Sequence, residues 1–175
     1  RSSDLEIYAV DSLTHLMGEL KGIQLPKIKI GEAYPIRERD HDYDNDLEEL
    51  LNLTFPLRHQ YGYCPRHNVS IVSDSTSVRP KVLFVGNSYF WAMKYFVPFQ
   101  ELFEDTEFWF YASTAYFGED LSQTISVTQL DLVEKLLEFD YVVWFATGNQ
   151  INKGTERFAH RALVNLCYDK KEIGS

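Results

Sequence analysis

Two short segments combine residue types that could carry out acyl transfer. The first, Gly86-Asn87-Ser88-Tyr89, directly follows a continuous apolar run and leads into a helical pattern. Gly86 permits a tight turn there, and the turn would place Ser88 at the start of the helix. Backbone N–H groups at a helix start can stabilise an oxyanion while a serine hydroxyl attacks an acyl carbon. The same position suits a helix N-cap, so Ser88 has two candidate roles.

The second segment spans residues 146–152 and contains Gly148-Asn149. An asparagine amide that follows a buried strand can donate to an oxyanion. Gly-Asn pairs are also common in turns, so Asn149 taken alone is better interpreted as a turn residue. Together with Ser88 on a neighbouring strand, the turn interpretation and the oxyanion interpretation are equally favoured.

A parallel sheet would position both segments. Apolar runs predict buried strands at 81–86, 107–111 and 139–146, and helical periodicity predicts helices at 89–104, 128–138 and 154–168. Pro98 should kink or split the first of these helices. The alternation predicts an α/β fold with helices on both faces of a parallel sheet. In such a sheet function gathers at the carboxyl ends of the strands, here the loops 85–89, 111–114 and 146–152.

The first half of the chain has weaker patterns. Residues 4–21 predict an amphipathic helix with Leu5, Ala9, Leu13, Leu16, Met17 and Leu20 on its apolar face. Ser3 or Asp4 is the expected N-cap, and Gly22 the expected C-cap. Residues 25–31 predict an edge strand, 47–53 a short helix, and 57–80 a loop. We expect 1–175 to form a single domain in which residues 31–80 are a loop-rich insertion.

Composition excludes several classes of function. The net charge of −9 over 175 residues disfavours nucleic-acid binding. No apolar run is long enough to span a bilayer. No His/Cys cluster has metal-ligand spacing, and a phosphate-binding loop for a flavin-type cofactor is lacking, so we expect neither a metal nor a cofactor. The acidic residues around His41 allow two minor alternatives, adventitious binding of Ca²⁺ and a role for His41 as the base. Cys64 and Cys167 could form one disulfide, which the sequence does not decide.

Strand-Gly86-Asn87-Ser88-Tyr89-helix resembles the first conserved block of the SGNH hydrolase-like superfamily, whose usual form is Gly-Asp-Ser. The similarity is greater to the branch of alginate O-acetyltransferases and the teichoic-acid D-alanylation protein, and greatest to uncharacterised secreted members of Bacteroides type. It extends over nearly the whole chain, through Asp42-Tyr43-Asp44, Phe55-Pro56-Leu57, Ser73-Asp74-Ser75 and Trp91.

The resemblance implies that Ser88 is a nucleophile carrying an acyl group and that Asn149 assists at the oxyanion, with Thr147 or Gln150 as alternatives. In that branch an Asp-x-His pair precedes the first helix, so the activating His would stand directly before Arg1. Here Asn87 replaces the usual Asp, and no Asp-x-His occurs in the chain. A serine without a base is a poor nucleophile, so we expect this chain to be an incomplete piece of the enzyme.

These observations predict the C-terminal part of a secreted or periplasmic acyltransferase or acylesterase that acts on a glycan or cell-envelope polymer. Tyr89, together with Tyr116, is the expected glycan-contacting aromatic residue near the strand ends. The alternative is a non-catalytic relative that binds a glycan or a protein partner, which the missing His and Asn87 favour.

Overall fold

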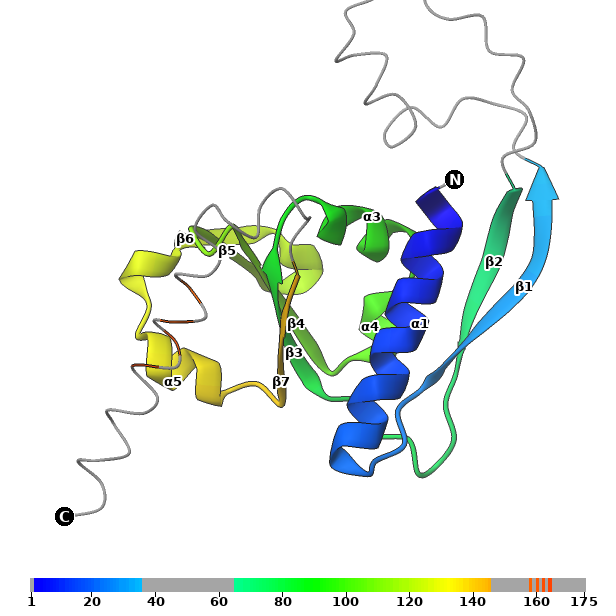
Figure 1. The fold of residues 1–175 in the computed structure, drawn as a ribbon, viewed down its shortest axis with the longest axis horizontal. Helices are drawn as coiled ribbons and strands as arrows, with labels where there is room; N and C mark the ends of the chain where they lie inside the picture. Colours follow the sequence, from blue (N-terminus) through cyan, green and yellow to red (C-terminus); the bar gives the residue numbers. More distant parts are fainter. Residues whose placement is uncertain are drawn as a thin grey trace, which may run out of the picture.

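The chain adopts a mixed α/β fold, seen in a computed structural model that describes residues 2–35, 65–145, 158, 160, 162 and 164 (Figure 1). Among the described residues, five strands form one sheet and two further strands form a separate hairpin. The predicted helix at 47–53 and the charged segment around His41 lie outside the described residues. Of the predicted helix at 154–168, the four described residues are helical.

Helix α1 (Ser2–Lys21) ends as the sequence predicts, at Gly22. Gly22 has φ +65°, which glycine adopts without strain. The Gly22 amide donates to the Glu19 carbonyl (3.3 Å), and the Ile23 amide to the Gly18 carbonyl (3.0 Å). This pair of bonds is a Schellman motif, which satisfies two of the carbonyl groups left free at the helix end. The predicted N-cap is wrong, because Ser3 and Asp4 lie inside the helix.

The buried face of α1 matches the predicted apolar face only in part, since Met17 is buried and Leu13 packs against the core as predicted. The side chains that pack inward recur at helical spacing and are Ile7, Val10, Thr14 and Met17. Leu5, Leu16 and Leu20 are instead 73%, 51% and 71% exposed. The buried stripe is therefore rotated around the helix from the predicted one and overlaps it at Met17.

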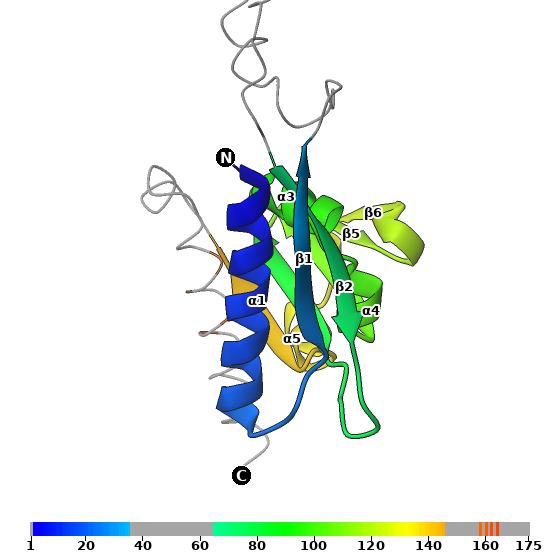
Figure 2. The ribbon, with the colours of Figure 1, turned by 90° about the vertical axis from the view of Figure 1, so that its right-hand side faces the viewer.

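A second correction concerns residues 57–80, where we predicted a loop. Strand β2 (Pro65–Val72) pairs antiparallel with β1 (Lys27–Pro35), with a bulge between Ile30 and Ala33. Ile28, Ile30, Val69 and Ile71 pack against the main core, while the alternate positions are exposed. The hairpin runs beside α1 (Figure 2). In β2 the alternation is short, because the aliphatic residues that pack inward are Val69 and Ile71, and the strand signal in the sequence is therefore weak.

The main sheet has the strand order β6-β5-β4-β3-β7. β3 (Lys81–Gly86) pairs in parallel with β4 (Asp105–Phe110) on one side and with β7 (Tyr141–Trp144) on the other. The three predicted strands therefore exist and are parallel, but the predicted burial is wrong for β7, where Val142 and Trp144 are exposed. The prediction of an entirely parallel sheet is wrong, because β5 (Thr114–Phe117) and β6 (Gln123–Ser126) are antiparallel and had been missed.

Helices follow the strands largely where periodicity places them. The predicted helix 89–104 is split at Pro98 into α3 (Tyr89–Phe96) and α4 (Phe99–Leu102). The predicted helix 128–138 is two pieces, a 3₁₀ turn η2 (Val127–Gln129) and α5 (Leu132–Leu137), which Asp131 caps by accepting from the Val133 and Glu134 amides. A further 3₁₀ turn, η1 (Glu119–Leu121), joins β5 to β6.

The side chains of β3 alternate between two core clusters. Val82 and Phe84 point into a cluster built with α1, α3 and α4. Leu83 and Val85 point into a second cluster with Trp109 and Leu136 of α5. Because successive strand residues face opposite sides of a sheet, helices pack against both faces of β3. Stacked aromatic rings fill the first cluster, including Phe90 on Phe108 at 4.1 Å between centroids.

Candidate functional site

The Gly86–Tyr89 turn lies at the topological switch point of the sheet, where the strand order reverses. β3 is followed by β4 on one side, and the chain later returns to place β7 on the other side. In open α/β sheets a crevice forms at the carboxyl ends of the strands at such a point. Gly86 is needed there for space, since a Cβ would lie 2.6 Å from the Phe145 ring and 2.7 Å from the Phe145 carbonyl oxygen.

Asn87 and Ser88 have different roles at the start of α3. Ser88 has helical backbone angles (φ −62°, ψ −13°) and makes no capping hydrogen bond with its side chain. The Asn87 Oδ1 atom instead accepts from the Tyr89 amide at 3.1 Å. Asn87 is buried, whereas Ser88 is exposed. Ser88 therefore holds the N-cap position of α3, but the side-chain hydrogen bond at the helix start is made by Asn87, and Ser88 is exposed at the carboxyl end of β3.

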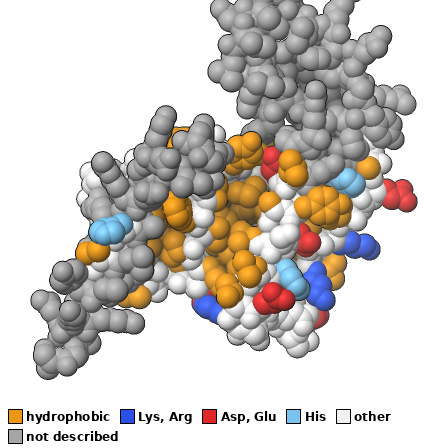
Figure 3. Space-filling view, in the orientation of Figure 1, with side chains coloured by type: hydrophobic (Ala, Val, Ile, Leu, Met, Phe, Trp, Pro, Cys, Tyr) orange, Lys and Arg blue, Asp and Glu red, His pale blue; other side chains and the backbone are white. Residues whose placement is uncertain are grey.

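A pocket of about 420 Å³ opens next to this turn. Asn87 and Tyr89, the two neighbours of Ser88 in sequence, form part of its wall. The rest comes from α1, α3, β3 and the end of β7, through Ala9, Leu13, Phe84, Met93, Val143, Trp144 and Phe145. Figure 3 shows a hollowed apolar surface between α1 and β7. The wall carries no charged side chain among the described residues, so the site favours an apolar group.

Another part of this edge is strained. Tyr111 and Ala112, just after β4, have φ values of +50° and +52°. Left-handed angles are unusual for bulky residues and concentrate at functional sites. The Tyr111 amide donates to the Gly86 carbonyl at 2.7 Å and so joins this turn to the Ser88 turn. Tyr111 is 44% exposed and Tyr89 is 56% exposed, so both rings are accessible at the carboxyl edge.

The structure removes one aromatic candidate. The Tyr116 ring packs edge-on against Trp91, with 5.1 Å between centroids, and also stacks on Phe108 at 5.9 Å. Tyr116 is therefore a packing residue rather than a ligand contact. Tyr111 was not predicted as a site residue, because its signal is a backbone angle that no residue pattern displays.

Glu6 is a second residue that the sequence reading missed. Its side chain is only 5% exposed, which is rare for a carboxylate. It lies three positions before Ala9 and seven before Leu13, so the three share one side of α1. Its position beside Ala9 and Leu13, which were predicted to lie on the apolar face of this helix, was the signal available in the sequence.

Two histidines of the described residues, His15 and His67, have partners away from Ser88. His15 Nε2 lies 3.3 Å from Glu19 Oε1 on the exposed side of α1, and His67 Nδ1 lies 3.0 Å from the Gly31 carbonyl in the hairpin. His160 is exposed. Within residues 2–35 and 65–145, no three metal-binding side chains gather in a group. Thr147, Asn149 and Gln150 lie outside the described residues, so their approach to Ser88 stays a prediction.

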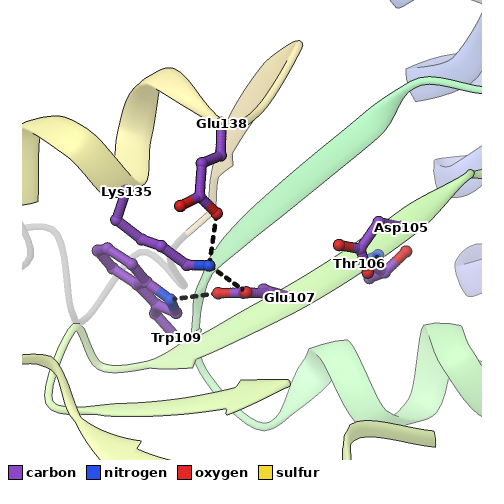
Figure 4. Close-up of polar contacts among 6 residues, drawn as sticks. All are labelled: Asp105, Thr106, Glu107, Trp109, Lys135 and Glu138. Atoms are coloured by element: carbon purple, nitrogen blue, oxygen red, sulfur yellow. Dashed lines mark hydrogen bonds and ion pairs between the residues drawn. The ribbon is translucent and has the colours of Figure 1, made fainter. Parts of the chain in front are cut away.

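A nearly buried ion pair lies away from this turn. Glu107 of β4 is 5% exposed and receives Lys135 Nζ of α5 at 2.7 Å; Trp109 Nε1 donates to the same carboxylate at 3.4 Å (Figure 4). Lys135 also binds Glu138 at 2.7 Å. Burial alone would lower the pKa of Lys135, but its bonds and charge interactions with Glu107 and Glu138 raise the pKa. Lys135 is therefore a structural cation.

Comparison of the chain with protein-family models, with curated proteins and with solved structures gave no match. Among the described residues, none of the helices is both long and apolar enough to cross a membrane.

Proposed function

We propose that this chain is the serine-bearing part of an SGNH-like acyltransferase or acylesterase that acts on a glycan or cell-envelope polymer outside the cytoplasm. The observation that carries the proposal is the exposed Ser88, which follows the central strand β3 at the start of α3 and makes no capping hydrogen bond with its side chain. The resemblance assigns the nucleophile to this residue. The proposed fold is the three-layer SGNH arrangement, of which β4, β3 and β7 with helices on both faces would be the core.

In the proposed reaction, Ser88 Oγ forms a bond to the acyl carbon of a donor ester, and its proton passes to a base. The backbone N–H of Ser88 and the Asn149 amide stabilise the oxyanion. The tetrahedral intermediate then expels the donor alcohol, which takes the proton from the base. A polymer hydroxyl or water attacks the acyl-serine in the second half of the reaction and regenerates Ser88.

The proposed base is the His of an Asp-x-His pair directly ahead of Arg1. The start of α1 lies at the same end of the molecule as the carboxyl ends of β3 and β7 (Figure 1), which supports this assignment. Ala9 also forms a wall of the pocket with Asn87 and Phe145. A residue just before α1 would therefore approach the edge of the sheet that carries Ser88.

A fluorophosphonate probe tests the proposal, applied to the chain together with the residues encoded upstream of Arg1. We expect covalent labelling that Ser88→Ala abolishes. Ser113→Ala is the matched control, because Ser113 is also exposed at a strand end but donates its hydroxyl to the Phe110 carbonyl (2.8 Å). Absence of labelling, or equal labelling of the Ser88→Ala variant, would overturn the proposal.

A non-catalytic binding module is the second candidate. Tyr89 and Tyr111, which are both exposed near the carboxyl ends of β3 and β4, favour it, because exposed aromatic rings can stack on sugar rings. In that case the protein would bind a cell-envelope glycan without labelling of Ser88, and Tyr111→Ala would weaken the binding.

A further inference from the structure

We propose that the pocket beside Ser88 holds an apolar acyl chain, so the transferred or removed group is longer than acetyl. The inference rests on the proposed function and names the class of acyl group for that site. It follows from the position of the pocket, from the residues of its wall and from its volume.

The first step is position. Asn87 and Tyr89 border both the Ser88 turn and the pocket. An acyl chain attached to Ser88 would therefore have this pocket as its nearest apolar surface. Asn87 provides the polar end, where an ester group would lie, and its Oδ1 is already engaged by the Tyr89 amide.

The second step is the chemistry of the wall. Beyond Asn87 and Tyr89, every described residue of the wall has a hydrophobic side chain, and none of them is charged. A sugar ring would leave most of its hydroxyl groups without partners there, and unpaired polar groups oppose binding. An alkyl chain has no such groups. Met93 adds a flexible side chain that can adapt to different chain lengths.

The third step is size. A volume of about 420 Å³ falls within the range of roughly 300–1,000 Å³ seen for small-molecule sites. An acetyl group would use only a small part of it. Ala9 helps to form the wall and is itself exposed, so a larger side chain at this position would fill the pocket without entering the core.

The test is equilibrium binding of neutral methyl esters, from acetate to octanoate, followed by tryptophan fluorescence. Trp144 lies in the wall, and Trp144→Phe identifies its signal. We expect affinity to rise about fourfold for each methylene that enters the pocket. Ala9→Phe should abolish this gain. Leu16→Phe is the matched control, because Leu16 is exposed on the same helix but does not line the pocket.

The outcomes separate this inference from the proposed function. Chain-length dependence that Ala9→Phe removes and Ser88→Ala leaves unchanged supports the pocket, whether or not a fluorophosphonate labels Ser88. Labelling of Ser88 with affinity indifferent to chain length would keep the proposed function and overturn the pocket. Self-association that Ala9→Phe and Leu16→Phe weaken equally, without chain-length dependence, would assign this face to a second copy and also overturn the pocket.

Discussion

At the scale of single residues, Asn87 holds the start of α3 while Ser88 stays accessible. The Asn87 side chain accepts the Tyr89 amide, and Ser88 contributes only its carbonyl, which accepts from Trp91 at 3.1 Å. An asparagine can therefore replace the aspartate expected from the resemblance without loss of the capping bond. What changes is charge, because the amide adds no negative charge beside the serine.

This arrangement predicts different costs for two neighbouring substitutions. Asn87→Ala removes the cap and should lower the free energy of unfolding by at least about 1 kcal/mol. Ser88→Ala removes an exposed hydroxyl that makes no cap and should change it by less than about 0.5 kcal/mol. Urea denaturation of both variants measures the difference. An equal loss in both would mean that Ser88 shares the capping role.

Gly86 shows how far a residue type predicts its own environment. The sequence indicated a site without room for a side chain, and the structure confirms this by the approach of Phe145. The sequence could not identify Phe145 as the neighbour, because that contact depends on the parallel pairing of β3 with β7. In the same way, Tyr111 is identified as a site residue by its backbone angle and by its hydrogen bond to Gly86, neither of which the sequence displays.

At the scale of elements, α5 is fixed to β4 by the ion pair between Lys135 and Glu107. The Lys135 side chain is 22% exposed and that of Glu107 is 7% exposed. Removing the cation would leave a nearly buried carboxylate unpaired, which is costly. The outer partner, Glu138, is 51% exposed, and solvent screens its interaction.

We therefore expect Lys135→Met to lower the free energy of unfolding by about 3 kcal/mol. Glu138→Gln, the matched control, should cost less than about 1 kcal/mol, because an exposed pair contributes little. Thermal and urea unfolding of the two variants check this ranking. Equal effects would show that the outer pair, rather than the buried one, holds α5 in place.

The elements that the sequence predicted well have continuous apolar runs. β3 and β4 are buried at most of their apolar positions, whereas in β7 the run persists although Val142 and Trp144 are exposed. β5 and β6 were missed because three of the four β6 residues, Gln123, Thr124 and Ser126, are exposed and give no apolar run. The face of α1 was misassigned in part, because this helix carries two overlapping apolar stripes and helical spacing alone does not say which stripe is covered.

At the scale of the whole molecule, α1 is joined to the start of β7 by two polar contacts. The Tyr141 hydroxyl donates to the Met17 carbonyl at 2.6 Å, and Lys21 Nζ lies 3.1 Å from Asp140 Oδ1. Asp140 Oδ2 also accepts the Lys81 amide at 3.0 Å. That amide bond, followed by Lys21, holds the pKa of Asp140 below its ordinary value of 3.8.

A lowered carboxyl pKa makes this junction sensitive to acid. Its contribution to stability is complete above about pH 4 and is lost as the pH falls through the lowered pKa of the folded state. We expect Asp140→Asn to reduce the acid dependence of the free energy of unfolding below about pH 4. Asp105→Asn, at the start of β4, is the control, because Asp105 takes no part in this junction. No difference between the two variants would contradict the assignment.

The contacts that hold α1 also bear on the order of folding. Strands β3 to β6 come from one continuous stretch of chain, whereas Tyr141 and Met17 are 124 positions apart in the sequence. Distant contacts require a larger loss of chain entropy before they form, so the sheet from β3 to β6 should assemble before α1 docks. The pocket beside Ser88 has α1 as one wall, so it would be completed late in folding. A molecule bound in that pocket would contact both α1 and the sheet, and would therefore stabilise the docked position of the first helix.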